Sequence, residues 1–297
     1  PMIPFYTFYS MFGFQRVGDA LWGASDSRAR GFLLGATAGR TTLHGEGLQH
    51  QDGHSHVLAS VIPACEAYDP AFAYEMASIV ESGIDRMYGK GEDVYFYLTL
   101  YNEPWIQPEK PEGVDEGIIN GLYRFADRPA EGEHKATILF SGPAHRAARE
   151  AQQLLLSDFG VSVELWSATS YKRLREEAIA VERWNRLHPT EEPRIPLVTT
   201  LLSESEGPIV AVTDYMRMVP DQIAAFSPRS FLSLGTDGYG RSDTREALRT
   251  FFEVDTPNVV VAVLTALARD GEIDPSVVQK AIEHYDIDND AAPPWTR

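Results

Sequence analysis

The sequence predicts an α/β protein of two consecutive units, each containing a mostly parallel sheet covered by helices. Two observations support this prediction. Short apolar runs of strand character alternate with stretches whose apolar residues recur at helical spacing. The chain also has 297 residues, which is enough for two domains of ordinary size. Strands that alternate with helices favour parallel pairing, with both faces of the sheet covered.

Composition limits the class of protein. Apolar residues make up 43% of the chain and charged residues 23%, which is typical of a globular protein. The formal net charge of −17 argues against a nucleic-acid partner, because phosphate binding requires a basic face. No run of about 18 apolar residues is found, so no membrane span is expected. The single cysteine, Cys65, excludes an internal disulfide, suits a reducing cytosol and is expected to be a buried apolar residue.

The first unit is expected to contain three strands and two helices. Aromatic, β-branched and other apolar residues predict strands at residues 3–9, 31–36 and 94–101. Helical spacing of apolar residues predicts helices at residues 15–30 and 72–88. Residues 102–117 carry three prolines and show little periodicity, so they are expected to form a linker. We place the boundary between the units after residue 110.

The second unit, residues 111–297, alternates strands and helices more regularly. Strands are predicted at residues 136–140, 161–166, 195–202, 209–213 and 231–234. Helices are predicted before Gly160 and at residues 171–187, 244–252, 259–269 and 275–285. This alternation is typical of a doubly wound sheet.

The histidine loop, residues 45–56 (GEGLQHQDGHSH), is the strongest candidate for chemistry. It contains three imidazoles and two carboxylates, from Glu46, His50, Asp52, His54 and His56. No hydrophobic period runs through it, so it is expected to be a loop rather than a core element. Its glycines allow close approach of the backbone to a ligand. A loop of this composition is typical of acid–base chemistry near neutral pH.

Two other interpretations of the histidine loop compete with an acid–base role. A metal site would use the three histidines with Asp52, but Gly53 and the missing HExxH pattern argue against a helical zinc site. A solvated polar loop with incidental histidines is the plainest alternative. We favour an acid–base loop that lines a small-molecule site.

Two further segments are candidates for a binding role. The aromatic run near the start of the chain is compatible with core packing, or with a flat apolar slot in which Tyr9 and Phe12 bind a heteroaromatic ring. The glycine-rich loop, residues 235–243 (GTDGYGRSD), lacks both the Walker A and the dinucleotide-binding patterns. We therefore interpret it as a turn followed by a helix that Ser242 or Asp243 caps.

Four longer motifs resemble one family. They are FYSMFGFQRVGD, ARGFLLGATAGRTTLHGEGLQHQDGHSH, ERWNRLHP and LGTDGYGRSDTREALRTFFEVD. Together they are similar to the homodimeric bacterial pyruvate dehydrogenases, the thiamine diphosphate-dependent decarboxylating components of the pyruvate dehydrogenase complex. The resemblance covers essentially all 297 residues in the same order.

The resemblance implies a fold and a cofactor. Residues 1–110 would be the later part of a thiamine diphosphate pyrimidine-binding domain, and residues 111–297 a transketolase-type C-terminal domain. The cofactor would be thiamine diphosphate with Mg²⁺, and the metal ligands and the glutamate that contacts the aminopyrimidine would lie outside this chain. Because the chain begins at Pro1, in an aromatic run and without Met, we expect a fragment or one half of a split enzyme that is inactive alone.

The resemblance also assigns residues to the site. Tyr9 and Phe12 would face the aminopyrimidine ring of the cofactor. Glu46 and His50 would lie near the thiazolium and the substrate. We hypothesise that His50 serves acetyl transfer.

Asp52 and His56 match the DGxxH motif of the wider transketolase superfamily, whose residues contact substrate or intermediate. We hypothesise that His56 positions the substrate. Gln51 stands where some relatives carry Glu.

The implied reaction is the oxidative decarboxylation of pyruvate with transfer of the acetyl group to lipoamide. The implied partners are the lipoyl domain of dihydrolipoyl acetyltransferase and a second subunit of a homodimer, in the cytoplasm and without nucleic acid or membrane. Two rivals remain open. One is a transketolase or another 2-oxo acid dehydrogenase, and the other is a non-catalytic assembly module.

Overall fold

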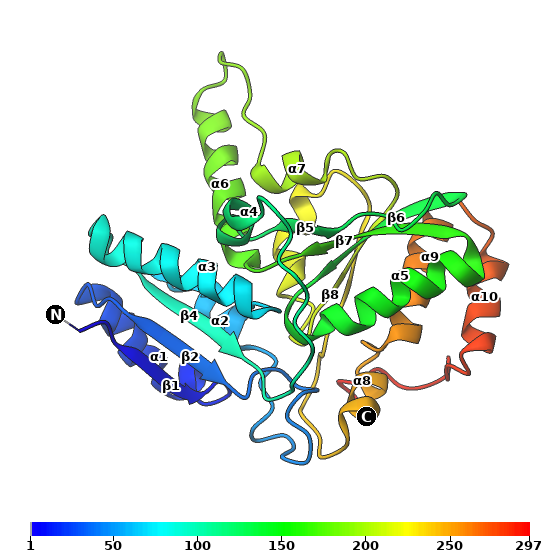
Figure 1. The fold of residues 1–297 in the computed structure, drawn as a ribbon, viewed down its shortest axis with the longest axis horizontal. Helices are drawn as coiled ribbons and strands as arrows, with labels where there is room; N and C mark the ends of the chain where they lie inside the picture. The colour runs from blue at the N-terminus through cyan, green and yellow to red at the C-terminus, as the bar shows by residue number, and fades with distance from the viewer. Residues whose placement is uncertain (1) are drawn as a thin grey trace.

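Two β-sheets, each flanked by helices, form the framework of the molecule (Figure 1). The computed structural model describes residues 2–297, so residue 1, where the first predicted domain starts, lies outside the described residues. In the first sheet all strand pairs are parallel, in the order β1-β2-β4-β3. Its strands are β1 (Phe5–Tyr9), β2 (Phe32–Ala36), β3 (Cys65–Tyr68) and β4 (Tyr95–Leu100).

The second sheet has the order β5-β7-β6-β8-β9 and is parallel apart from the antiparallel pair of β5 with β7. Successive parallel strands are added on both sides of β6, which is the predicted doubly wound arrangement. The strands are β5 (Tyr123–Ala126), β6 (His134–Phe140), β7 (Val161–Ser167), β8 (Ile209–Val212) and β9 (Phe231–Leu234).

Side chains of strand β4 pack against helices on both faces of the first sheet, because successive side chains of a strand point to opposite sides. Tyr95 and Tyr97 pack on one face, and Phe96 and Leu98 pack on the other. The first face is covered by α1 (Gly13–Asp26) and α2 (Ser55–Ser60). The second face is covered by α3 (Ala73–Ile84), the π-helical turn η1 (Asp85–Gly89) and α4 (Asp115–Asn120).

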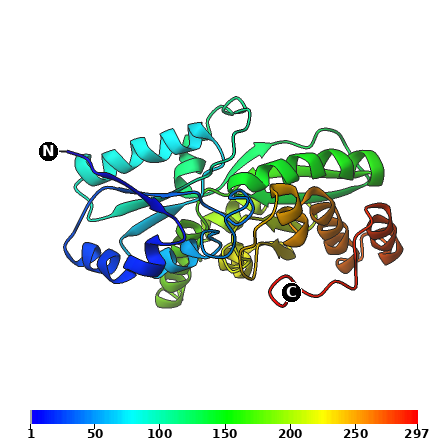
Figure 2. The ribbon, with the colours of Figure 1, turned by 90° about the horizontal axis from the view of Figure 1, so that it is seen from below.

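Strand β6 has the same role in the second sheet, with Ile138 and Phe140 on one face and Leu139 on the other. The first of these faces is covered by α5 (His145–Phe159), which follows the 3₁₀ turn η2 (Gly142–Ala144), and by α8 (Arg245–Phe251), α9 (Thr256–Arg269) and α10 (Pro275–His284) (Figure 2). The opposite face is covered by α6 (Tyr171–Leu187), α7 (Leu197–Leu202) and the 3₁₀ helix η3 (Pro220–Phe226).

Strand β1 forms an edge of the first sheet and is exposed. Phe5, Tyr6 and Tyr9 are 50%, 63% and 48% exposed, whereas Phe14 at the start of α1 is buried. Parallel strands are normally covered on both faces, so this edge is unusual. The interpretation of the aromatic run as core is therefore wrong for these three side chains, and Tyr9 is accessible to a ligand.

One predicted strand, at residues 195–202, is the helix α7 (Leu197–Leu202). A short apolar run does not distinguish a strand from a buried helical turn by periodicity. In the structure, Val198 and Leu202 are both fully buried, and their spacing of four residues is that of one helix face. Tertiary burial thus overrides the β-branched composition of this run.

Four short elements are absent from the predictions. They are α2, β3, α4 and β5, each of four to six residues and too short to show a period. The helix α4 begins at Asp115, so the predicted linker ends earlier than expected. By contrast, α6 and β9 have the bounds that the sequence predicts. Cys65 is buried in β3 as predicted, and burial raises the pKa of its thiol to about 12.

One segment, Arg245–Arg269, is long and apolar enough to cross a membrane by length and composition alone. In the structure the segment is divided into α8 and α9, and half of its most apolar stretch is buried. Val260, Val263 and Leu267 of α9 are fully buried against the second sheet. The segment therefore has the packing of core helices.

Candidate functional site

The histidine loop follows β2 and lies where the carboxyl ends of the two sheets meet, the edge at which open α/β sheets bind ligands. Its residues up to 54 form a loop, but His56 lies in the first turn of α2 rather than in the predicted loop. Two backbone hydrogen bonds join it to the second sheet. Gly45 N donates to Asp243 O at 3.2 Å, and Met216 N donates to Gly53 O at 2.8 Å. Figure 1 shows these segments at the bottom, in blue and yellow.

Four predicted site residues form one cluster, which we call the open face: Tyr9, Phe12, Glu46 and His50. The ring centroid of His50 lies 5.6 Å from that of Tyr9 and 5.3 Å from that of Phe12, both edge-on. The rings of Tyr9 and Phe12 are 5.7 Å apart. Two segments distant in sequence, the end of β1 and the histidine loop, therefore build one aromatic and titratable surface.

The imidazole of His50 is partly exposed as a whole, but its Nδ1 is buried. Its Nδ1 lies 3.5 Å from Glu46 Oε2, but the contact does not have hydrogen-bond geometry, and Nδ1 has no hydrogen-bond partner among residues 2–297. We regard the pair as close charges rather than a hydrogen bond. The side chains of His50 and Glu46 are 27% and 51% exposed. The guanidinium of Arg16 lies 4.0 Å from the ring centroid of Phe12 and adds positive charge beside them.

Asp52 is fully buried and accepts hydrogen bonds from both units. Its Oδ1 accepts from His54 N at 3.0 Å and from Ser55 N at 2.9 Å, where α2 begins. Its Oδ2 accepts from the hydroxyl of Tyr215 at 3.1 Å. A carboxylate that binds first-turn amides stabilises a helix start. Asp52 therefore links α2 to the segment after β8, away from the open face.

His56 is also buried, with 6% of its surface exposed. Its ring packs edge-on against Tyr215, with 4.7 Å between centroids, and its Nε2 lies 3.4 Å from Thr99 Oγ1. Burial lowers the pKa of the imidazole, while Asp69 and Asp52 act in the opposite direction. A neutral histidine in this setting contributes packing rather than an accessible acid.

The structure therefore brings together four of the six predicted site residues and separates the other two. Sequence reasoning missed Tyr215, which contacts both Asp52 and His56. It also missed the burial of Gln51, which is 1% exposed. Tyr215 lies 163 positions after Asp52 in the chain. No local pattern in the sequence indicates such a contact.

The glycine-rich loop is more than a turn before a helix, because it also contacts the histidine loop. The hydroxyl of Ser242 donates to Gly45 O at 2.8 Å. The predicted helix cap by Ser242 or Asp243 is wrong, because Thr244 Oγ1 accepts from Ala247 N at 3.2 Å and caps α8. No local pattern connects the two loops, because Gln51 and Arg241 are 190 positions apart.

No group of three or more His, Cys, Asp or Glu side chains within residues 2–297 is arranged to hold a metal ion. The three histidines of the loop point to different neighbours. His50 contacts Tyr9 and Phe12, whereas His54 Nε2 pairs with Gln15 Oε1 at 2.7 Å.

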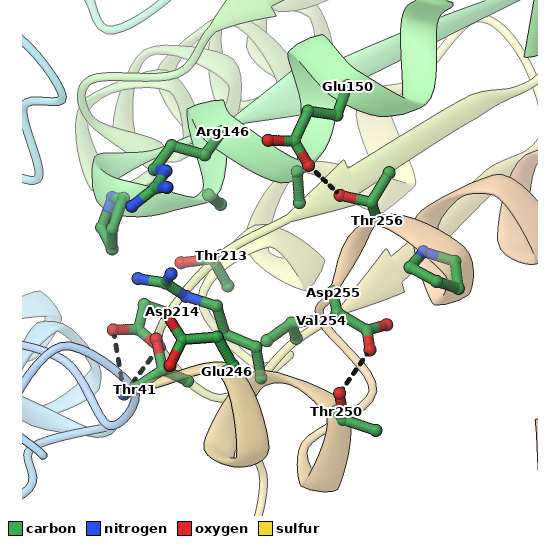
Figure 3. Close-up of a pocket in the computed structure, with 15 residues that line it drawn as sticks. Thr41, Arg146, Glu150, Thr213, Asp214, Glu246, Thr250, Val254, Asp255 and Thr256 are labelled. Carbon is green, nitrogen blue, oxygen red and sulfur yellow. Dashed lines mark hydrogen bonds between the residues drawn. The ribbon is translucent and has the colours of Figure 1, made fainter. Parts of the chain in front are cut away.

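A separate cavity of about 330 Å³ lies beyond the carboxyl ends of β6 and β8 (Figure 3). This is the point where the strand order of the second sheet reverses. Two of its carboxylates are already satisfied by hydroxyl groups. Glu150 accepts from Thr256 Oγ1 and Asp255 accepts from Thr250 Oγ1, each at 2.7 Å. These side chains hold α5, α8 and α9 together.

Asp214, which lines the same cavity, supports the segment that leads into the histidine loop. Its two carboxylate oxygens lie 3.1 and 3.2 Å from Thr41 N, which donates to them. Burial raises the pKa of Asp214 to about 7, and the positive charge of Arg249 opposes this rise. Asp214 therefore connects the cavity to the segment that precedes the histidine loop.

Sequence families match both units. Residues 1–108 match the pyruvate dehydrogenase E1 component middle domain, and residues 121–255 match the transketolase-like C-terminal domain.

Proteins named pyruvate dehydrogenase E1 component are similar over nearly the whole chain. The protein of Mycolicibacterium smegmatis is 55% identical over 294 residues, covering 98% of this chain and 32% of the relative. That of Escherichia coli K12 is 50% identical over 297 residues, covering 99% and 33%. The chain spans about a third of the length of these relatives.

Solved transketolase structures share the fold at low sequence identity. The transketolase of Campylobacter jejuni superposes with a TM-score of 0.67 at 15% identity, over 89% of this chain and 36% of that one. A split-gene transketolase, described as an inactive beta4 tetramer, superposes with a TM-score of 0.60 at 17% identity, over 90% of this chain and 77% of that one. This chain therefore shares its arrangement of two α/β units with these transketolases.

Proposed function

The chain belongs to the pyruvate dehydrogenase E1 family, and we propose that its open face is one side of a thiamine diphosphate site for the oxidative decarboxylation of pyruvate. The observation that supports this proposal most is the convergence of Tyr9, Phe12, Glu46 and His50 from two distant segments. Aromatic rings beside an acid–base pair match what a heteroaromatic cofactor and a 2-oxo acid require.

The residues present fit part of such a site. The exposed ring of Tyr9 and the neighbouring ring of Phe12 offer an apolar surface to the aminopyrimidine. Thiamine diphosphate, when bound, would act as the electron sink for decarboxylation. The ligands of its diphosphate and of Mg²⁺ would come from parts of the enzyme outside this chain.

The chain's own groups would orient the substrate and move protons. We assign proton donation during acetyl transfer to His50, whose side chain is 27% exposed at the open face. Glu46 would orient the imidazole, and Arg16 would attract the carboxylate of pyruvate. For Asp52 and His56 we propose a positioning role, since both are buried away from the open face.

The wider context follows from the same proposal. The acetyl acceptor would be the lipoyl domain of dihydrolipoyl acetyltransferase, and the enzyme would work as a homodimer in the cytoplasm. Residues 1–110 would form part of the pyrimidine-binding domain and residues 111–297 the C-terminal domain.

A chimera tests the proposal. This chain would replace the matching third of the Escherichia coli relative, and the product would be assayed with pyruvate and lipoyl domain, and separately with ketose phosphates. We expect pyruvate-dependent acetylation of the lipoyl domain. Turnover of ketose phosphates alone would favour a transketolase, and a folded chimera without either activity would favour an assembly module. Decarboxylation of pyruvate by the isolated chain would contradict the need for upstream parts.

A further inference from the structure

We propose that the glycine-rich loop of the second unit positions His50 in the open face, acting through Gln51. This unit contributes no side chain to the open face itself. The geometric part of the proposal stands alone, and only its catalytic consequence rests on the proposed function. Gln51 is a positioning residue in this view.

The side chain of Gln51 connects the two loops. Its Oε1 accepts from Arg241 N at 2.7 Å, and its Nε2 donates to Leu43 O at 2.6 Å. The side chain of Gln51 is 1% exposed, and its bond to Leu43 is buried, whereas the bond from Arg241 is partly buried. Buried hydrogen bonds of this kind are costly to break. The bond to Leu43 also closes residues 43–51 into a ring, so that this segment, which contains His50, is fixed at both of its ends.

A second contact lies on the other side of His50. Gly45 donates its amide to Asp243 O at 3.2 Å and accepts from the hydroxyl of Ser242 at 2.8 Å. The two contacts bracket the segment from Gly45 to Gln51, which contains His50 and Glu46. The glycine-rich loop therefore holds the backbone on both sides of the open-face residues.

Close backbone approach explains two of the glycines. A Cβ atom at Gly240 would lie 2.7 Å from the Cβ of Gln51. One at Gly47, whose φ is +75°, would lie 3.0 Å from the hydroxyl of Ser242. Both distances are too short for a side chain without movement of the neighbouring loop. The two loops are thus fitted to each other by contact as well as by hydrogen bonds.

These contacts from the second unit fix the backbone of His50, while its ring packs against residues of the first unit. The amides of His50 and Gln51 both donate to Gly47 O, each at 3.2 Å, which forms a tight turn. The ring of His50 then lies against Tyr9 and Phe12 of the first unit. An acid–base group must be held within a fraction of an ångström to act, so the glycine-rich loop would set the geometry of the step.

Nuclear magnetic resonance of the 297-residue chain tests this directly. Nuclear Overhauser effects would be measured between the ring protons of His50 and those of Tyr9 and Phe12. Gln51→Leu removes both side-chain hydrogen bonds at similar volume, and we expect these effects to be lost. The matched control is Gln152→Leu in α5, which removes two side-chain hydrogen bonds, to Val163 O (2.8 Å) and to Asp127 O (3.2 Å), and should leave the effects intact. Unchanged effects in folded Gln51→Leu would overturn the proposal.

Ser242→Ala is the milder second variant, for use if Gln51→Leu does not fold. It removes one hydrogen bond to Gly45, and we expect weaker effects between His50 and Tyr9. Full wild-type intensity in Ser242→Ala would then overturn the proposal. In the chimera, Gln51→Leu should lower kcat for acetyl transfer about tenfold to a hundredfold, with little change in KM for pyruvate. If His50→Ala has no effect on the chimera, the proposed function fails, whereas the resonance result still decides the positioning role.

Discussion

The outer half of the histidine loop, residues 45–50, and its inner half, residues 51–56, contain the same types of side chain in opposite surroundings. Glu46 and His50 in the outer half are 51% and 27% exposed at their side chains. Asp52 and His56 in the inner half are 0% and 6% exposed. The inner pair is bound to Tyr215 of the second unit, and the outer pair faces the aromatic end of β1.

Burial, not residue type, therefore distinguishes the two halves of the loop. A carboxylate and an imidazole close in sequence suggest acid–base work wherever they occur. Of the two pairs, Glu46 with His50 and Asp52 with His56, only the outer one has the exposure for it. The inner pair supplies hydrogen bonds and packing that hold the loop and the start of α2. Substitutions in the two halves should therefore affect different properties.

The largest effect on stability should come from Asp52→Ala. The change leaves the buried amides of His54 and Ser55 and the hydroxyl of Tyr215 without their acceptor. We expect a loss of about 3–4 kcal/mol in the free energy of unfolding, measured with urea. The control is Asp274→Ala, which removes only an exposed cap of α10 and should cost much less. Equal losses in the two variants would show that Asp52 is no more than a helix cap.

Asp214→Asn should change how the free energy of unfolding depends on pH. The pKa of Asp214 is raised from an ordinary value of 3.8 to about 7, mainly by burial. Its contribution to stability is therefore complete below pH 3.8 and is lost as the pH rises through 7. Asn removes this loss, so the variant should be more stable than the wild type at pH 8 and similar to it near pH 4. A constant difference across this range would contradict the assignment.

A smaller effect is expected from His56→Phe as the pH falls. Burial lowers the pKa of His56 in the folded chain, so the neutral ring contributes stability above the ordinary value of 6.5. That contribution is lost as the pH falls below 6.5 toward the lower pKa of the folded state. The Phe variant should therefore lose less stability than the wild type between pH 7 and pH 5, measured by thermal unfolding at each pH. Parallel curves would count against a buried neutral His56.

The smallest effect on stability should come from His50→Ala in the outer half. The side chain is partly exposed and its Nδ1 makes no hydrogen bond within residues 2–297. We expect a change of about 0.5 kcal/mol or less in the free energy of unfolding, measured with urea. A loss as large as that of Asp52→Ala would mean that the two halves do not differ.

Local patterns were sufficient for most of the fold. The helix α6 and the strand β9 were predicted with their observed bounds, because each combines a clear period with clear ends. The segment of α7 was assigned to the wrong class, since six apolar residues carry no decisive period. The exposure of β1 could not be predicted, because it depends on which strand lies at the edge of the sheet.

The candidate site divides in the same way. Residue type and family resemblance identified Tyr9, Phe12, Glu46 and His50, which lie together. The same reasoning included Asp52 and His56, whose burial depends on Tyr215. Contacts over such long sequence separation arise from packing of the two units, and a single sequence does not report them.

The most direct test of the account is the rate of acetyl transfer to the lipoyl domain by the His50→Ala chimera in a single turnover. The account predicts a fall of about 10²–10⁴-fold, the usual contribution of a positioned acid or base, while the stability of the chain stays unchanged. An unaltered rate of acetyl transfer would contradict the assignment of chemistry to the outer half of the histidine loop.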